Sequence, residues 1–588
     1  MALIDKASLL MVPSTYEAGK LYNVLPSGNR APDQTGENSG YDQTRADFDF
    51  DRGSNTAATR VNADGLIEKY RENLFTYSND ISNAAWLKGV ITATGGQSGY
   101  DGSSDAWLIT KDANAYRAIE HDVNNSGVYT YSVYAKANTL DKIYLRNQTL
   151  NQGAYFNLTN GTAYGVSSLF SSIDSVGEGW YKCSVTFNGS STRLAIYIDF
   201  DIATAGSVFV QDFQVEKGLV ATDVLTSGAT TGKAGVLIDL PRIDYSSGAG
   251  ALLLEPSRQQ LFPHSEYFDT WNSDLSEVRT PNSIVSPEGV LNGYTLAANN
   301  GGSALNIYDA ISVTSGADYV FSVWLKKKTT NEIQLYMYST SAPVGFVSRA
   351  EVDFDAGTIT NLDGSGATIE PYKNGWFRCS VKCTAPAAGL SNGIYNTDGG
   401  ADVYAYGAQL EAGSYVSSYI PNHGESGGVT RAADLCYKMG VSDVIGQTEG
   451  TLFYDWVMNH ESPNTSEDLY TLTMSDGTGN KMIGVNNYNN TLVVFIKDTT
   501  TQFYDNSYTS GADGARIKLA IGYANNDIAL YINGAQIATD SSATIPTLSQ
   551  VRLNTFWNGN LADFSSVKQL ALFNERLTNE ELATLTTL

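Results

Sequence analysis

The chain has 588 residues, the length of three or four domains of about 150 residues each, which excludes a single-domain protein. Its 62 acidic and 37 basic residues give a formal net charge of -25, which argues against nucleic acid or an anionic membrane surface as a partner. Hydrophobic residues make up 42% and charged residues 17%, with 55 glycines and 36 tyrosines, a composition typical of β-sheets and tight turns rather than of disorder or coiled coil.

Residues 1–46 are predicted to form a separate attachment segment that is poorly ordered by itself. The segment has no basic start, and Asp5 and Lys6 interrupt its apolar residues, so it does not resemble a signal peptide. The stretch over 26–42 is rich in Gly, Asn and Asp and is predicted to be a loop. We expect deletion of 1–46 to leave soluble modules that no longer attach. The expected docking surface consists of four apolar side chains, Leu9, Leu10, Met11 and Val12.

The middle of the chain contains an internal repeat of one module. Four anchors recur in the same order, roughly 190 residues apart, which chance does not readily produce. The pairs are RENLF and RQQLF, YTYSVYAK and YVFSVWLK, GWYKCSV and GWFRCSV, and VFVQDFQVEKG and VYAYGAQLEAG. We therefore predict two copies of one module, at residues 71–225 and 258–421.

Apolar residues alternate with a period of two inside each copy, which is the pattern of half-buried strands. This alternation directs Cys183 and its counterpart Cys379 inward, each into its own core, so the two thiols do not form a disulfide. Many such strands, separated by clusters of Gly, Asn, Asp and Ser, indicate an antiparallel β-sandwich. Superposition of the copies around Val133 and Val323 is predicted to bring Cys183 onto Cys379.

Related connectors flank the two copies, at residues 47–70, 226–257 and 422–444. They share stretches such as FDFDRGSNTAATR, IDLPRIDYSSGAG and GGVTRAADL. Their aliphatic runs favour ordered straps that tie one module to the next, and free linkers are the alternative.

Residues 445–588 form a distinct last module. KLAIGYANNDIALYINGAQIA predicts strands in a hairpin ladder, with Asn533-Gly534 as a tight turn. The C-terminal segment predicts a strand followed by a short helix that begins with a capping box of Thr578 and Glu581. The fold class is therefore all-β, with several antiparallel β-sandwich domains.

No chemistry-bearing constellation stands out, and we predict no enzyme. The four histidines lie far apart in the sequence, which disfavours a histidine metal site or a catalytic triad. The four cysteines are too few for a disulfide framework, and Cys436 has no identifiable histidine partner. A carboxylate pair such as Asp353 and Asp355 does not indicate a glycoside hydrolase, because among 62 acidic residues some pair matches any spacing. The histidines are His121, His264, His423 and His460.

Three stretches of the sequence carry a resemblance to known families. The C-terminal LYINGAQ and LFNERLTNEEL resemble the laminin-G-like, concanavalin-like lectin fold, and the repeats, which open on ENLF and close on QVEKG or QLEAG, resemble carbohydrate-binding jelly rolls. Over nearly its full length the chain resembles fibre and spike proteins of tailed bacteriophages, whose N-terminus reads like MALIDKASLLMVPSTYEAGKLYNVLPS. The resemblance implies a virion surface protein, made in the cytoplasm of the bacterial host, attached to capsid or tail proteins through its N-terminus, and often trimeric.

Aromatic residues on polar faces are the candidate glycan-binding residues. Flat rings suit the CH groups of a pyranose, while neighbouring polar groups bind its hydroxyls. The alternative is that these rings pack on a strap, a neighbouring module or another subunit. We expect recognition of host surface polysaccharide in the C-terminal module, which lies farthest along the chain from the attachment segment. The candidates are Trp557, Asn558 and Asn560 in a turn of that module, Tyr134 and Tyr197 in the first copy, and Trp324 in the second.

No cofactor is required by these patterns. Asp- and Asn-rich turns could bind calcium, at a discontinuous site without EF-hand spacing. Three functions stay open: a glycan-binding adhesin, a purely structural decoration protein of capsid or tail, and a tailspike polysaccharide depolymerase. Incubation with host polysaccharide separates them, because the adhesin retains it, the depolymerase shortens it and the decoration protein does neither.

Overall fold

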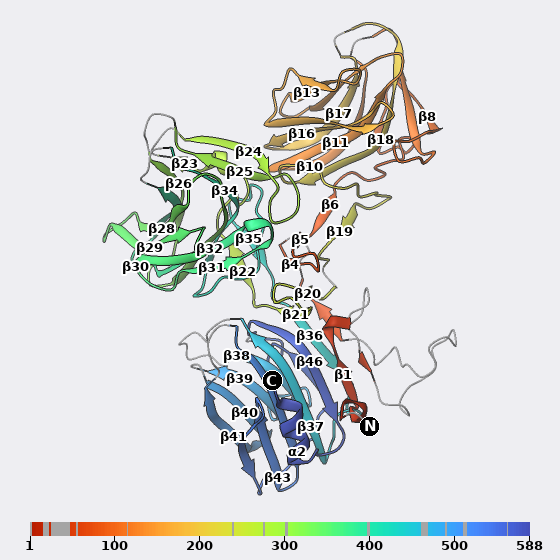
Figure 1. Cartoon of the computed structure of the whole chain (residues 1–588). Coiled ribbons are helices and arrows are strands. Elements are labelled where there is room, and N and C mark those ends of the chain that lie inside the picture. The colour runs from red at the N-terminus through yellow and green to blue at the C-terminus, as the bar shows by residue number, and fades with distance from the viewer. Residues whose placement is uncertain are drawn as a thin grey trace. The chain divides into compact units, whose positions relative to one another are not determined.

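The computed structural model is built almost entirely from antiparallel β-sheets (Figure 1). Its one α-helix within these residues, α2 (Asn579–Thr586), covers part of the last module, and no helix among them is long and apolar enough to cross a membrane. Short 3-10 turns are η1 (Leu3–Lys6), η2 (Pro13–Thr15), η3 (Phe268–Thr270) and η4 (Lys373–Gly375). The structure describes residues 3–15, 23–24, 48–53, 57–114, 116–200, 202–237, 240–273, 277–299, 304–396, 400–459, 469–488, 491–509, 514–560 and 562–588.

The chain forms two compact units, and both are discontinuous in sequence. Unit 1 comprises Met1–Glu68, Val236–Arg258 and Thr430–Leu588, and unit 2 comprises Lys69–Gly235 and Gln259–Val429. The two repeated modules therefore belong to unit 2. Most of each connector belongs to unit 1, together with the N-terminal segment and the C-terminal module.

Unit 1 is a sandwich of two sheets. The first runs in the order β2 (Asn23–Val24), β1 (Leu9–Met11), β46 (Ser565–Phe573), β37 (Glu449–Met458), β42 (Arg516–Ala524), β43 (Asp527–Ile532) and β44 (Ala535–Asp540), with β21 (Ala251–Leu254) on β46 and β20 (Arg242–Asp244) on β21. The second runs in the order β3 (Asp49–Asp51), β36 (Leu435–Met439), β45 (Gln550–Leu553), β38 (Leu469–Ser475), β39 (Lys481–Tyr488), β40 (Thr491–Asp498) and β41 (Thr500–Thr509).

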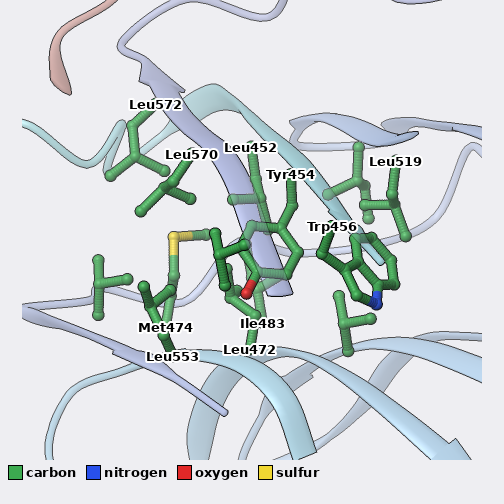
Figure 2. Packing of buried hydrophobic residues seen from close by; sticks show 14 of the residues in the cluster. Leu452, Tyr454, Trp456, Leu472, Met474, Ile483, Leu519, Leu553, Leu570 and Leu572 are labelled. Carbon is green, nitrogen blue, oxygen red and sulfur yellow. The ribbon is translucent and has the colours of Figure 1, made fainter. Parts of the chain in front are cut away.

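The inner faces of these two sheets share one apolar core. Leu452, Tyr454 and Trp456 alternate along β37 and point toward Leu472 and Met474 of β38 in the facing sheet (Figure 2). The period of two along β37 thus directs every second side chain into the sandwich.

The N-terminal strand is part of this core, which corrects one expectation. β1 pairs with β46 in the register Leu9↔Leu572 and Met11↔Leu570, and both Leu9 and Met11 are fully buried. Leu9 and Met11 therefore cannot supply an exposed docking surface, and Leu10 and Val12 are only half-buried. Deletion of residues 1–46 would remove strands β1 and β2 and the core side chains of Leu9 and Met11 from unit 1, so intact modules are no longer expected from it. The predicted loop over 26–42 lies outside the described residues.

The described parts of the connectors are strands and turns of ordered structure. β3, β20, β21 and β36 all come from connectors and pair within the unit 1 sheets. A hairpin, β4 (Thr59–Val61) with β5 (Ile67–Lys69), belongs to the first connector, and two further pairs join β19 (Gly232–Ala234) to β6 (Arg71–Asn73) and β22 (Arg258–Gln260) to β35 (Val429–Arg431). The alternative of free linkers does not hold for these segments.

One arginine from each connector enters a buried charge cluster in unit 1, which we call the arginine node. Arg52 lies 3.2 Å from Asp434, and Arg242 contacts both Asp434 and Glu255, the latter at 2.6 Å. Arg431 lies 3.0 Å from the same Glu255. All five side chains have no exposed surface, and the charges face one another, backbone carbonyls and the backbone N–H of Glu255, which donates to Asp434.

The two modules of unit 2 repeat one sandwich, strand for strand. The first sheet of module 1 runs in the order β15 (Phe170–Gly177), β16 (Trp180–Asn188), β11 (Val128–Ala137), β18 (Gly206–Lys217), β9 (Ala106–Lys111) and β8 (Thr92–Gln97). Its second sheet runs in the order β14 (Thr162–Tyr164), β13 (Gln152–Asn157), β12 (Lys142–Asn147), β17 (Ser191–Ile198), β10 (Ala118–Asn125) and β7 (Trp86–Leu87). The first sheet of module 2 runs in the order β31 (Thr368–Pro371), β32 (Phe377–Thr384), β27 (Asp318–Lys327), β34 (Asp402–Ala412), β25 (Gly293–Ala297) and β24 (Val278–Ile284). Its second sheet runs in the order β30 (Thr358–Asp363), β29 (Gly345–Asp353), β28 (Glu332–Ser339), β33 (Gly389–Asn396), β26 (Leu305–Ser312) and β23 (Asn272–Ser273).

The register of the central strands agrees between the modules to the residue. Val133 of β11 stands opposite Cys183, and Val323 of β27 stands opposite Cys379. Both thiols are fully buried, each in the core of its own module. The predicted equivalence of Cys183 and Cys379 is therefore confirmed.

The recurring QVE and QLE motifs, on β18 and β34, form the same polar network in both modules. Gln214 donates to Glu216 at 2.7 Å, and Glu216 accepts from the backbone and hydroxyl of Thr222. Gln409 donates to Glu411 at 2.8 Å, and Glu411 accepts from Ser417 in the same two ways. These buried carboxylates have their hydrogen bonds satisfied, which explains why the motif recurs where its neighbours vary.

Two local motifs of the last module form as the sequence predicts. Asn533 and Gly534 have φ of 49° and 82° and join β43 to β44, the backbone that a type I′ hairpin turn requires. The Thr578 side chain accepts from the backbone N–H of Glu581, whose carboxylate accepts from the Thr578 N–H, which completes the capping box of α2.

We predict that Asp434→Asn lowers the free energy of unfolding of the chain by about 3 to 5 kcal/mol, because two buried guanidiniums lose their shared counter-charge. The measurement is chemical denaturation followed by tryptophan fluorescence. The matched control is Asp122→Asn, which removes an exposed partner of Arg193 and should cost under about 1 kcal/mol. Equal losses in the two variants would contradict a stabilising role for the arginine node.

Candidate functional site

Tyrosines of four neighbouring strands stand in one row on module 1, on the sheet face that points away from the core. The register places Tyr197 of β17 opposite Tyr144 of β12, Tyr144 opposite Tyr155 of β13, and Tyr155 opposite Tyr164 of β14. We call this set the tyrosine row. Each ring is directed outward because its neighbours along the strand fill the core, as Ile143 and Leu145 do beside Tyr144.

The rings of the tyrosine row stack on one another. The centroids of Tyr144 and Tyr155 lie 4.2 Å apart and those of Tyr155 and Tyr164 lie 5.2 Å apart, both with interplanar angles of 19°. Phe200 packs 4.8 Å from Tyr197, and exposure rises along the row from 7% at Tyr197 to 38% at Tyr164. The accessible end of the row is therefore formed by Tyr155 and Tyr164.

Polar and charged side chains border the buried end of the row. Gln148 donates to the Tyr197 hydroxyl at 2.7 Å and to Glu120 at 2.9 Å. Glu120 also pairs with Arg193 at 3.2 Å, and the Arg146 guanidinium lies 5.9 Å from the Tyr197 ring. Aromatic surface next to fixed hydrogen-bonding groups is the combination that binds a sugar, whose rings have apolar CH faces and polar hydroxyl edges.

Module 2 has one tyrosine and three polar side chains at the same four positions, while its Tyr336 and Phe346 rings meet edge to face farther along β28 and β29. Tyr395 of β33 occupies the position of Tyr197, and the register runs on through Gln334, Glu351 and Thr360. The stacked tyrosines are thus a feature of module 1 and not of the shared fold.

The other two predicted rings of the repeats are buried, which corrects their assignment as exposed binding residues. Tyr134 stacks on Tyr100 at 3.7 Å, with the two ring planes 2° apart. Trp324 is 1% exposed and lies between Arg378, at 4.4 Å, and Tyr419, at 5.2 Å. Both rings do point away from the main core, but loops of their own module cover them. Neither ring can offer a face to a glycan.

The predicted turn of the last module lies between β45 and β46. Asn558 and Asn560 are exposed and Trp557 is half-buried. The backbone N–H of Phe556 donates to Asn560 at 2.9 Å, and the Phe556 ring packs 4.2 Å from Tyr470. This turn is a second, smaller aromatic surface, on unit 1.

Metal-binding side chains are not clustered in the described ranges. No group of three or more His, Cys, Asp or Glu side chains there lies close enough to hold a metal ion, so calcium remains a prediction from sequence. Burial raises the pKa of the Cys183 and Cys436 thiols, which disfavours the reactive thiolate. His460 lies outside the described residues.

Sequence reasoning singled out Tyr197 but missed the other three members of the tyrosine row. Tyr144 in IYL and Tyr155 in AYF carried the same signal as Tyr197 in IYI, a tyrosine between two apolar residues, and Tyr164 did not. That alternation predicts an outward ring in each strand, but the sequence does not say which strands are neighbours or in what register.

No protein-family model and no curated protein matches the chain. Among solved structures, the CBM40 domain of a Ruminococcus gnavus intramolecular trans-sialidase bound to α2,3-sialyllactose is 18% identical, with 26% of this chain and 91% of that one covered and a TM-score of 0.22. The tandem CBM22 domains of Paenibacillus barcinonensis Xyn10C are 12% identical, covering 62% and 100%, with a TM-score of 0.21. Domains LG4-5 of the mouse laminin α1 chain are 10% identical, covering 58% and 96%, with a TM-score of 0.17. At such scores these likenesses carry no argument about function, and the fold rests on the sheets described above.

We predict that Asp212→Asn makes the chain more stable than the wild type at pH 8 but not at pH 4. Asp212 lies at the bulge of β18 and accepts from the Tyr100 hydroxyl at 3.1 Å, and burial raises its pKa from 3.8 to about 6. Because the folded pKa is the higher one, wild-type stability falls as pH rises through about 6. The asparagine does not ionise and avoids this loss.

The measurement is thermal denaturation of both proteins between pH 4 and pH 8. Asp101→Asn is the control, because Asp101 is exposed and its hydrogen bonds with Ser103 lower its pKa, so the asparagine brings no gain at pH 8. A wild type and an Asp212→Asn variant with parallel pH profiles would contradict the assignment.

Proposed function

We propose that this chain is a bacteriophage virion surface protein, a head or tail fibre or spike, that binds glycans of the host cell surface as an adhesin. The sequence resemblance to phage fibre and spike proteins supports the virion assignment. The proposal includes synthesis in the host cytoplasm, attachment to capsid or tail proteins through the N-terminal region, and assembly as a trimer. Calcium bound at a discontinuous site belongs to the same proposal.

The tyrosine row is the observation that carries glycan binding. It gathers four aromatic rings on one sheet face, and two of them, Tyr155 and Tyr164, are accessible. Module 2 has the same fold but lacks the row, so core packing alone does not require these rings. A binding role accounts for the difference between the modules.

We assign the primary glycan site to module 1 and a secondary one to the Trp557 turn. The sequence-based preference for the C-terminal module rested on its distance along the chain from the N-terminal segment. That reason is gone, because β1 pairs with β46 inside one sandwich. Several copies on one virion would strengthen a weak site through avidity.

The experiment that tests the proposed function is incubation of the purified chain with host surface polysaccharide. Retention of polysaccharide without change in its length supports the adhesin. Shortening of the polysaccharide would indicate the depolymerase, and absence of both would indicate the structural decoration protein.

We predict that Tyr155→Ala and Tyr164→Ala each weaken glycan binding by about 1 kcal/mol, or roughly fivefold in Kd, because each removes one contact ring. The measurement is titration calorimetry with host oligosaccharides. Tyr395→Ala is the matched control in module 2 and should leave the Kd unchanged. Loss of binding in Trp557→Ala alone would move the site to the turn of unit 1.

A further inference from the structure

A lysine at the end of the first connector has its ammonium inside module 2. Lys69 is the last residue of β5, and its Nζ lies 2.7 Å from Glu288 Oε1 and 3.2 Å from Glu266 Oε1. The side chains of Lys69, Glu266 and Glu288 are 12%, 1% and 6% exposed. The connector that leads into module 1 is thus joined to module 2 by a nearly buried ion pair with two carboxylates.

The site that receives the ammonium is lined with oxygen atoms. Glu266 accepts from the hydroxyls of Tyr406, at 3.3 Å, and Tyr419, at 3.1 Å, and Glu288 accepts from the Asn292 amide at 2.9 Å. Glu266 Oε2 and Asn292 Oδ1 are buried and accept no hydrogen bond from the described residues. These oxygens and the two carboxylates favour a cation in the site.

Module 1 has a corresponding site, in which a side-chain amide of the module takes the place of the Lys69 ammonium. The loops match, because Gly99 and Ser286 both donate to a residue four positions on, and Asp101 stands where Glu288 does. Gln211, which pairs with Tyr134 as Tyr406 pairs with Trp324, donates its amide to Asp101 at 3.2 Å and to Asp105 at 2.7 Å. In module 1 the N–H donor is therefore supplied by the module itself.

The Tyr406 hydroxyl at this position in module 2 donates to Glu266 and is neutral, as the Gln211 amide is. Tyr406 replaces the amide of Gln211, and both acidic residues on the Lys69 ammonium are glutamates, with longer side chains than Asp101 and Asp105. The charge that neutralises the pair is carried in from the connector by Lys69. The comparison of the two repeats identifies the ammonium as the ligand of this site.

We infer that Glu266, Glu288 and Asn292 form a cation-receiving site in module 2 whose ligand is the ammonium of Lys69, and that the bound lysine is a latch between the two modules. A second contact lies beside it, where the Val128 N–H of module 1 donates at 2.6 Å to the carbonyl of His423, in the connector that directly follows module 2. Gly127 has a φ of 80°, and a Cβ there would lie 2.0 Å from that carbonyl oxygen, so this close approach requires glycine.

Removal of the ammonium would leave an empty site of hard oxygen ligands. Two carboxylates and an amide oxygen suit Ca²⁺, which binds oxygen ligands in flexible geometry. The latch therefore has a specific consequence. A chain without the Lys69 charge should lose stability and should regain it when Ca²⁺ occupies the vacated position.

The test compares Lys69→Met, Lys69→Met/Glu288→Gln and the control Lys233→Met by thermal denaturation with EDTA or with millimolar Ca²⁺. Lys233 is an exposed lysine 3.9 Å from Glu72. In EDTA we expect Lys69→Met to lower the Tm by about 5 °C or more. Addition of Ca²⁺ should restore the Tm of this variant. The double variant should be closer to the wild type in EDTA and should not respond to Ca²⁺.

Terbium luminescence gives an independent readout, because Trp324 lies beside Tyr406 and can sensitise a lanthanide in this site. We expect an additional Tb³⁺ signal in Lys69→Met that is absent from the wild type and from the double variant. A Tm of Lys69→Met equal to that of Lys233→Met, or the same Tb³⁺ signal in the wild type, would overturn the inference. If Lys69→Met does not fold, the double variant decides, and its failure to fold would also overturn the inference.

Discussion

The arginine node is the interaction on which the arrangement of unit 1 depends. The chain leaves this sandwich after Arg52, passes through it again between Arg242 and Glu255, and returns at Arg431 and Asp434. Each of these passages contributes at least one charge to the node. A buried charge without a partner is strongly unfavourable, so each of the three segments is stable only when the other two have placed their charged side chains in the node.

This constraint also explains why the connectors resemble one another. Their shared element is an arginine in the DR, PR and TR of the three stretches, and each of these arginines contacts Asp434, Glu255 or both. All three guanidiniums also donate to backbone carbonyls, Arg52 to that of Leu237, Arg242 to that of Thr59 and Arg431 to that of Pro256. Well-packed apolar residues could give comparable stability, but charges of fixed geometry also define which strands meet.

The sequence predicts those features that are local or repeated, and it misses those that depend on distant pairing. Period-two alternation and the repeat were enough for the sandwich class and for the equivalence of Cys183 and Cys379. The pairing of β1 with β46 was not accessible, because three residues near one terminus carry no signal for a partner near the other. Trp324 was correctly directed away from the main core, yet its exposure depended on Arg378 and Tyr419, which lie far from it in the sequence.

The pairing of β1 with β46 has a consequence for synthesis of the chain. Leu9 and Met11 are translated more than 500 residues before their partners Leu572 and Leu570. Both modules of unit 2 can complete their cores during that interval, since all their strands are already available. The sheet that contains β1 closes only after β46 has been translated, so a chain that terminates before β46 keeps exposed apolar residues that chaperones and proteases recognise.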